Sequence, residues 1–416
     1  MKRRKYNILI SGGYGNGNAG DEALMTSMLE QLRSILQINN ISLFSDDVSY
    51  SSKHYPSENF IYSGRFGILD KSSRGIFKLS WIFKAFNIIK RSDIFLTGGG
   101  TILQDQTHPL FIPFWLIKIF FARILNKKTM MYGIGAGPIT TNIGKYLTSN
   151  ILNQMNYITL RGQYSYNTLS KIGINNNIME VTADPAITLS WPSEEEINKI
   201  FKSEFSKNAL DTNNKIGFVI RRWYMFHKKS LTNKCWGRGG KKSYSRFITE
   251  MAKLADYFIK EKNAKIFFIP MSIKNPNDDR LAALDVVKKM KEKKSTYIME
   301  NEYSPNQIKG IIGKMDFIVG MRFHSLVFFS EFFKPMIGIA YGKKTFDFMG
   351  ELGLEEFVID VNNLKFEEAI ILSDRVIKFF NEPNNIYNID KRITKMKKRA
   401  LKNAKIVGSI LKNVNE

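Results

Sequence analysis

The chain has few of the residues that build disulfide frameworks and metal centres. A single cysteine, Cys235, stands among 416 residues, which excludes paired cysteines and a cysteine-rich metal site. The four histidines are scattered along the chain, which argues against a dedicated zinc site. We therefore predict that the protein holds neither a metal nor a resident cofactor.

Long apolar runs are also absent. No stretch of about eighteen consecutive apolar residues occurs, so no transmembrane helix is expected. The richest stretch, 110–125, contains Pro113, Lys118 and Arg123 and is better interpreted as a buried or interfacial helix. The basic residues at 2–5 are followed by a short strand and glycines, not by the apolar segment of a secretory signal. We expect a cytoplasmic protein.

Acidic residues are outnumbered, because 38 Asp and Glu face 62 Lys and Arg and leave a net charge of +24. Lysine-rich codon bias contributes to this excess. The charge also suits three kinds of partner, namely nucleic acid, an anionic membrane and a phosphorylated substrate. No helix-turn-helix spacing, zinc finger or RNP-like aromatic strand is visible, so nucleic acid is not the expected partner.

Short apolar runs alternate with helical patterns in both halves of the chain, which predicts parallel sheets covered on both faces. The expected fold class is α/β, with two Rossmann-like domains whose sheets face a cleft, followed by a basic C-terminal helix. The predicted boundaries are 1–190 for the first domain, 191–214 for a linker, 215–375 for the second domain and 376–416 for the helical extension.

The most informative motif is the glycine-rich segment between a predicted strand at 6–10 and a predicted helix at 21–36. Glycine permits a close backbone approach to a ligand, and the amides at a helix start favour an anion. The spacing matches neither the dinucleotide fingerprint nor a P-loop. The two acids of the segment either begin the helix or hold a sugar hydroxyl. The residues of interest are Gly13, Gly15, Asn18, Gly20, Asp21 and Glu22.

Further candidate residues follow other predicted strands of the first half. Gly99 and Gly100 come after the strand at 93–97, and Asp105 follows them. Each glycine loop alone is explained by close packing, but two loops at one sheet edge favour a ligand. Asp184, which precedes a proline, either orients a substrate or stabilises its own turn.

In the second half, cations gather at the ends of predicted strands. Arg322 offers a planar fork for phosphate or carboxylate, and His324 stands at a helix start where proton transfer is feasible. An ordinary capping histidine is the alternative. The other candidates for binding an anion are Arg221, Arg222, Ser325 and Lys344.

Taken in order, the motifs resemble those of the polysaccharide pyruvyl transferase family. The resemblance spans nearly the whole chain. It departs from the family pattern at Gly162, Ser272 and Gly342. The segments that carry it are 15–23, 98–105, 133–138, 161–165, 182–185, 321–324 and 341–344.

The resemblance implies a GT-B-like pair of domains, phosphoenolpyruvate as donor and a glycan sugar as acceptor, with the acceptor on the first domain and the donor on the second. The product is a pyruvyl ketal, and phosphate is released. It implies that Arg322 and His324 hold the donor, with Arg221 or Arg222. For His324 we expect acid–base work or phosphate contact. Asp21, Glu22 or Asp105 is the expected acceptor-side base.

Other functions stay open at this point. A glycosyltransferase that uses a nucleotide sugar has the same architecture, and a non-catalytic relative would only bind glycan. The basic tail at 391–412 carries apolar residues at helical spacing. It either packs on the body of the protein, which we prefer, or lies on a membrane. With a lipid-linked oligosaccharide as acceptor, basic and aromatic surface would make peripheral contact at the inner face of the plasma membrane.

Overall fold

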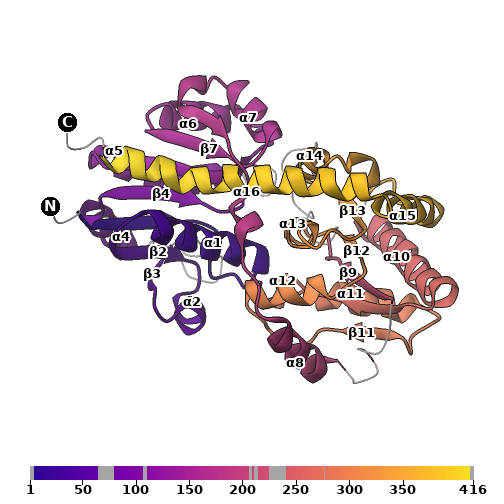
Figure 1. Cartoon of the computed structure of the whole chain (residues 1–416). Helices are drawn as coiled ribbons and strands as arrows, with labels where there is room; N and C mark the ends of the chain where they lie inside the picture. Colours follow the sequence, from indigo (N-terminus) through magenta and orange to yellow (C-terminus); the bar gives the residue numbers. More distant parts are fainter. Residues whose placement is uncertain are drawn as a thin grey trace. The chain divides into compact units, whose positions relative to one another are not determined.

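The computed structural model describes residues 4–63, 79–105, 110–205, 209, 214–223, 240–275 and 277–412. The single cysteine, Cys235, lies outside these ranges. The chain forms two compact units (Figure 1). The first comprises residues 1–17, 21–188 and 396–416, and the second comprises 18–20 and 189–395.

The first unit is built on a parallel sheet. Its strands follow the order β3-β2-β1-β4-β6-β7-β8, and the short β5 pairs with β6. Every pairing is parallel, as predicted. The strands are β1 (Tyr6–Ser11), β2 (Ile38–Ser45), β3 (Asn59–Tyr62), β4 (Ile94–Gly98), β5 (Thr101–Leu103), β6 (Lys128–Ala136), β7 (Tyr157–Leu160) and β8 (Met179–Val181).

Helices cover both faces of this sheet. Alternate strand residues point to opposite faces, so Phe95 joins one core with α4 to α7. Leu96 joins the other core with α1 and the end of α16 (Pro383–Lys412). The helices of this unit are α1 (Ala19–Ile35), α2 (Val48–His54), α4 (Leu79–Arg91), α5 (Phe111–Ile124), α6 (Asn142–Leu152) and α7 (Gln163–Ser170), with two 3-10 turns, η1 (Asn176–Ile178) and η2 (Pro185–Thr188).

The second unit repeats the architecture. Its parallel sheet has the order β11-β10-β9-β12-β13-β14. The strands are β9 (Lys215–Val219), β10 (Lys265–Phe268), β11 (Thr296–Ile298), β12 (Phe317–Gly320), β13 (Met336–Ala340) and β14 (Val358–Asp360). The helices are α8 (Glu194–Glu204), α10 (Gly240–Lys262), α11 (Arg280–Lys289), α12 (Pro305–Gly313), α13 (Phe323–Ser330), α14 (Lys343–Leu352), α15 (Phe366–Phe380) and the first part of α16 (Pro383–Lys412), with the 3-10 turn η4 (Glu355–Phe357).

Two predicted boundaries differ from the units of the structure. The stretch 191–214, predicted as a linker, belongs to the second unit. Within it Trp191 packs on Phe332 with ring centroids 5.0 Å apart. The predicted extension 376–416 is divided, because α16 belongs to the second unit up to Lys395 and to the first unit from Met396 onward.

The strand order locates the positions where such sheets bind ligands. In open parallel sheets a ligand sits beyond the carboxyl ends of the strands where the order reverses. That point lies between β1 and β4 in the first unit and between β9 and β12 in the second. The glycine loops after β1 and β4, and Arg221 and Arg322 after β9 and β12, therefore stand where a ligand is expected.

Candidate functional site

The centre of the second unit's site is a buried ion pair at the end of β12. Arg322 donates from Nε to Oδ2 of Asp279 at 2.9 Å and from Nη2 to Oδ1 at 2.5 Å. The Arg322 side chain is 8% exposed and that of Asp279 3%. Burial raises the pKa of Asp279, and the charge of Arg322 opposes that rise. This fork-shaped contact fixes the plane of the guanidinium.

Asp279 was not among the predicted residues. It begins the α11 segment after β10, and the backbone N–H of Met271 donates to it at 3.1 Å. The sequence offers a weak signal, since the polar run 277–279 follows the exit of a strand next to β9. A pairing across 43 positions is not visible in that pattern.

Arg221 and Arg222 separate after β9. Arg221 Nη2 donates to Asn277 Oδ1 at 3.5 Å, so it lies beside the loop that holds Asp279. Burial and the charge of Arg322 lower the pKa of Arg221. Arg222 instead forms an ion pair of 2.6 Å with Asp285 of α11. Of the two predicted arginines, Arg221 is therefore the one placed with Arg322.

Tyr341 brings an aromatic wall to the same cluster. It follows β13 and packs on Trp223 with ring centroids 4.5 Å apart. Arg221 Cζ is 5.8 Å and Lys344 Nζ 5.0 Å from the centre of its ring. Burial alone would raise the pKa of Tyr341, but the charges of Lys344, Arg221 and Arg322 outweigh it and lower the pKa to about 7. Tyr341 had been noted only as part of a motif.

His324, in the first turn of α13, is packed against the glycine of the first motif. A Cβ atom on Gly20 would stand 2.1 Å from His324 Nδ1. The backbone N–H of Ala19 donates to Met271 at 2.7 Å, and Asn18 forms an isolated antiparallel bridge with Ser272. Residues 18–20 are thus a part of the second unit. Gly20 was predicted to line a phosphate loop, and its missing side chain makes room for the imidazole.

Two hydroxyl groups complete the surroundings of this site. Ser325 is buried and its Oγ donates to the carbonyl of Arg322 at 2.6 Å, so it stabilises the turn that presents the arginine. Ser272 is 2% exposed, and its hydroxyl has no hydrogen-bond partner in the part of the chain that the structure describes.

In the first unit the two glycine loops are fastened together by Tyr14. Its hydroxyl donates to the carbonyl of Gly98 at 3.0 Å, and a Cβ atom on Gly99 would lie 3.1 Å from its ring. Gly15 has a φ of +83° and its N–H donates to Glu22 at 2.8 Å. Glu22, 3% exposed, therefore holds the first loop closed.

Asp21 lies where the two glycine loops meet. A Cβ atom on Gly100 would stand 3.1 Å from Asp21 Oδ1, and one on Gly13 would stand 3.9 Å from its carboxyl group. Asp21 is partly exposed, unlike Glu22. Two of the predicted glycines, Gly13 and Gly100, thus lie beside a carboxylate of the protein itself.

Asp105 fastens a neighbouring loop. It accepts four hydrogen bonds of 2.8 to 2.9 Å from the backbone and hydroxyl groups of Thr140 and Thr141, together with a second backbone contact from Thr140. Burial would raise the pKa of Asp105, but these donors outweigh it and lower the pKa. A carboxylate held in this way is poorly suited to accept a proton.

Asp184 pairs with an arginine that the prediction had placed in a motif only. Arg161 Nη1 lies 2.9 Å from Asp184, and Arg161 Nη2 donates to Thr101 Oγ1 at 2.8 Å. The backbone N–H of Ala186 also donates to Asp184 at 3.0 Å. Asp184 thus both stabilises its turn and orients Arg161.

Metal binding and pocket shape add little to these two sites. Among the described residues, no three His, Cys, Asp or Glu side chains gather as metal ligands. None of the described helices combines the length and apolar character needed to cross a bilayer.

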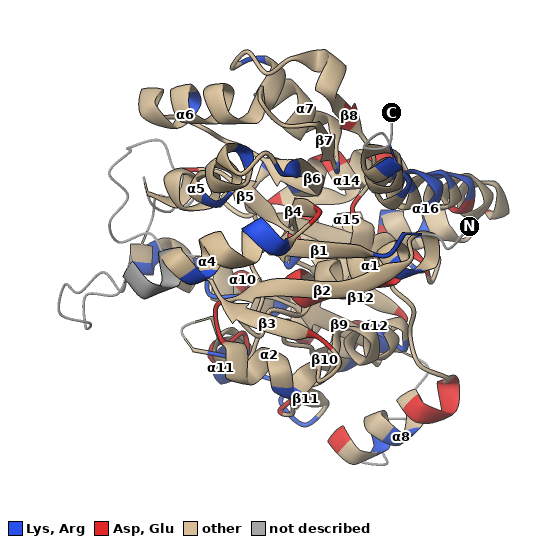
Figure 2. Ribbon diagram, turned by 90° about the vertical axis from the view of Figure 1, so that its left-hand side faces the viewer, with Lys and Arg blue, Asp and Glu red and all other residues tan. Residues whose placement is uncertain are grey.

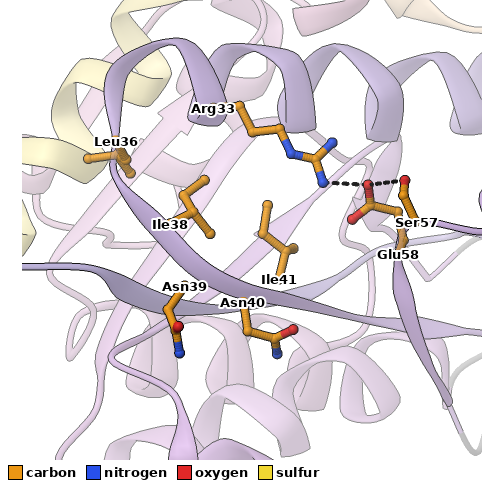
Figure 3. Close-up of a pocket in the computed structure, with 8 residues that line it drawn as sticks. All are labelled: Arg33, Leu36, Ile38, Asn39, Asn40, Ile41, Ser57 and Glu58. Atoms are coloured by element: carbon orange, nitrogen blue, oxygen red, sulfur yellow. Dashed lines mark hydrogen bonds and ion pairs between the residues drawn. The ribbon is translucent and has the colours of Figure 1, made fainter.

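A pocket between the end of α1 and the amino end of β2 is lined by Arg33 and Glu58, which form an ion pair (Figure 3). It lies at the opposite end of β2 from the glycine loops.

Comparison with known sequences matches this chain to a protein family and to a curated relative. The model of the family "Polysaccharide pyruvyl transferase" matches residues 18–343. The amylovoran biosynthesis protein AmsJ of Erwinia amylovora is 22% identical over 98% of this chain and 99% of its own length.

Solved structures share the fold at low sequence identity. A glycosyltransferase of Rickettsia africae has a TM-score of 0.58 at 15% identity and covers 99% of this chain and 100% of its own. Anabaena HepE in complex with UDP-glucose has a TM-score of 0.56 at 11% identity and covers 99% of both chains. UDP-GlcNAc 2-epimerase of Methanocaldococcus jannaschii has a TM-score of 0.56 at 13% identity and covers 89% of this chain and 92% of its own. The predicted pair of Rossmann-like domains is confirmed.

Proposed function

This chain belongs to the polysaccharide pyruvyl transferase family, and we propose that it transfers the enolpyruvyl group of phosphoenolpyruvate to a sugar of a cell-surface glycan or of its lipid-linked precursor. The product is a pyruvyl ketal and phosphate is released. The observation that carries the proposal is the cluster of Arg221, Arg322 and Lys344 around Tyr341 at the strand ends of the second unit, to which His324 also belongs.

The charges of this cluster suit the donor. Phosphoenolpyruvate carries a phosphate and a carboxylate, and both are bound well by guanidinium and ammonium groups. Arg322 is held in one plane by Asp279, which fixes the orientation of its guanidinium toward an anion. Lys344, over the ring of Tyr341, supplies a second cation from another strand.

Ketal formation sets the proton requirements of the site. The methylene carbon of phosphoenolpyruvate gains one proton and becomes a methyl group. Two sugar O–H bonds are replaced by two C–O bonds at the central carbon. The bond from that carbon to the phosphate oxygen breaks, and the second hydroxyl proton leaves with phosphate. We assign the acid–base work on the donor to His324, because it stands in the cation cluster's unit and at a helix start.

The acceptor-side base is best assigned to Asp21. Of the three predicted acids, Glu22 is bound to the N–H of Gly15 and Asp105 is held by two threonines. Asp21 is partly exposed at the glycine loops and follows Gly20, which packs against His324. A carboxylate there can accept a sugar hydroxyl proton.

A nucleotide-sugar glycosyltransferase is the competing function. It is prompted by the fold shared with HepE, whose solved complexes contain UDP-glucose or UDP. Fold alone does not transfer a donor, because one architecture hosts many activities.

The proposal is tested by measuring the pyruvate content of the cell-surface glycan in cells that normally produce this protein. Cells that lack the gene are complemented with the wild type or with His324→Ala, and ketal pyruvate is released from the purified polysaccharide by mild acid. We expect pyruvate only with the wild type. Equal pyruvate in the deletion and the wild type would overturn the proposal.

A further inference from the structure

The outer side of one helix layer of the first unit exposes large apolar side chains. Phe83 of α4, Phe120 and Ile124 of α5, and Ile143 and Tyr146 of α6 are 47% to 72% exposed. The opposite sides of these helices are buried against the first sheet, so the five side chains point away from it. Single exposed apolar residues are ordinary, but a group on one layer indicates a contact surface.

The three helices form a continuous layer. Phe86 of α4 meets Phe121 of α5 edge to face with ring centroids 6.3 Å apart. A Cβ atom on Gly144 of α6 would lie 3.2 Å from Ile112 of α5. Figure 2 shows α4, α5 and α6 next to one another. We call the outer side of these helices the α4–α6 surface.

The α4–α6 surface carries charge of one sign. The segments 79–91, 111–124 and 142–152 contain no Asp or Glu. Among their cations, Lys84, Lys90, Arg91 and Lys145 are exposed. The other two are not exposed, since Arg123 is half-buried and Lys118 is fully buried with Nζ 4.1 Å from the centre of the Phe114 ring. Aromatic and aliphatic side chains therefore lie among lysines with no neighbouring acid on these helices.

The basic helix α16 does not offer the same combination. It carries many cations (Figure 2), but its apolar face is used for packing. Ile393, Met396, Ala404 and Val407 are all buried, as expected for a helix that packs on the body of the protein. The group of exposed apolar side chains that accompanies cations therefore lies on the α4–α6 surface and not on α16.

We propose that the α4–α6 surface binds the surface of a bilayer that contains anionic phospholipids. The apolar side chains enter the interfacial region, and the lysines meet the lipid phosphates. A second copy of the chain is a poorer occupant, because a symmetric contact would place two surfaces of positive charge against each other. The proposal concerns the first unit alone and holds whatever the donor is.

The test is flotation of the purified full-length protein with vesicles of phosphatidylcholine alone or with added phosphatidylglycerol. The variant Phe120→Ser/Ile124→Ser removes apolar contact, and Lys84→Glu/Lys145→Glu reverses charge. The matched control is Ile371→Ser/Tyr387→Ser, because these residues are 59% and 66% exposed on the second unit. Circular dichroism checks that each variant is folded.

We expect binding to vesicles with phosphatidylglycerol, little binding to phosphatidylcholine alone, and weakening of about tenfold or more in both α4–α6 variants. The control should bind like the wild type. Three results would overturn the proposal. They are no binding of the wild type, unchanged binding of both α4–α6 variants, and an oligomeric state, measured by light scattering, that changes in these variants while vesicle binding does not.

Discussion

The imidazole of His324 rests on the backbone of Gly20, so closely that a Cβ atom at residue 20 would stand 2.1 Å from Nδ1. The glycine of the first motif and the histidine of the motif 321–324 are thus parts of one packed arrangement. Gly20 has no unusual φ, so the requirement for glycine comes from space and not from backbone strain.

The variant Gly20→Ala should therefore displace His324. We expect turnover to fall by about a hundredfold or more, since a misplaced acid–base group loses most of its effect. The matched control is Gly342→Ala, where an added Cβ atom meets nothing within 4 Å. Steady-state kinetics of both variants check this, and equal activity of Gly20→Ala and wild type would contradict it.

Loss of Asp279 should destabilise the folded protein, because the buried guanidinium of Arg322 would lose its carboxylate partner. Breaking a buried pair by removing one partner costs about 3–5 kcal/mol. We expect Asp279→Ala to lower the free energy of unfolding by that order. In Glu195→Ala, which breaks a pair with Lys199 at 74% and 79% exposure, the change should be about 0–1 kcal/mol. Urea unfolding measures both.

Tyr341 should titrate near neutral pH. Its lowered pKa of about 7 predicts a rise in tyrosinate absorbance at that pH, which is lost in Tyr341→Phe and kept in Tyr387→Phe. A bound anion would offset the charges of Lys344, Arg221 and Arg322, so phosphoenolpyruvate should raise the pKa of Tyr341. A midpoint that does not move with saturating phosphoenolpyruvate would contradict a donor bound in this cluster.

The same shift has a consequence for stability. Between pH 7 and the ordinary tyrosine value of 10.0, the unfolded chain holds the Tyr341 proton and the folded protein does not. The Tyr341 contribution to the free energy of unfolding therefore grows as the pH rises from about 7 and disappears as the pH falls through it. Thermal melts of wild type and Tyr341→Phe from pH 6 to pH 9 measure the difference, which should widen toward pH 9.

Asp21 and Glu22 should separate in their effects. Asp21→Asn should reduce turnover by about a hundredfold while the stability and the affinity for phosphoenolpyruvate stay near wild type. Glu22→Gln weakens a buried hydrogen bond to Gly15 and should cost about 1–3 kcal/mol of stability. Kinetics and urea unfolding on both variants check the assignment, and it fails if Asp21→Asn keeps full turnover.

Local patterns predicted most of the fold. The strand predicted at 336–340 is β13 with the same bounds. A short apolar run such as Met-Ile-Gly-Ile-Ala between polar turns is typical of a buried strand. The segment 48–62 was not predicted, although it forms α2 and β3. It is short and polar, and α2 is stabilised by Asp47, which accepts from the N–H of Tyr50 at 2.9 Å.

The site was less predictable, since it depends on contacts between distant residues. Arg322 and His324 were predicted as site residues from their place after a strand, and their roles remain predictions. Asp279 was not predicted, because only a weak polar run marks it and its pairing with Arg322 spans 43 positions. Asp105 was predicted as a base from its motif, but only the structure shows that Thr140 and Thr141 hold it. The place of residues 18–20 in the second unit was also not predicted, because it rests on contacts with the distant residues 271 and 272.

The most direct test is to measure the melting temperature of the purified protein with phosphoenolpyruvate and, in a parallel titration, with UDP. Ligand that binds only the native state raises the melting temperature by mass action. The account predicts that phosphoenolpyruvate raises the melting temperature and that this rise is lost in Arg221→Ala. The rise should be kept in Arg222→Ala, because the wild-type Arg222 is paired with Asp285 and not with the cluster. A rise with UDP and none with phosphoenolpyruvate would contradict it.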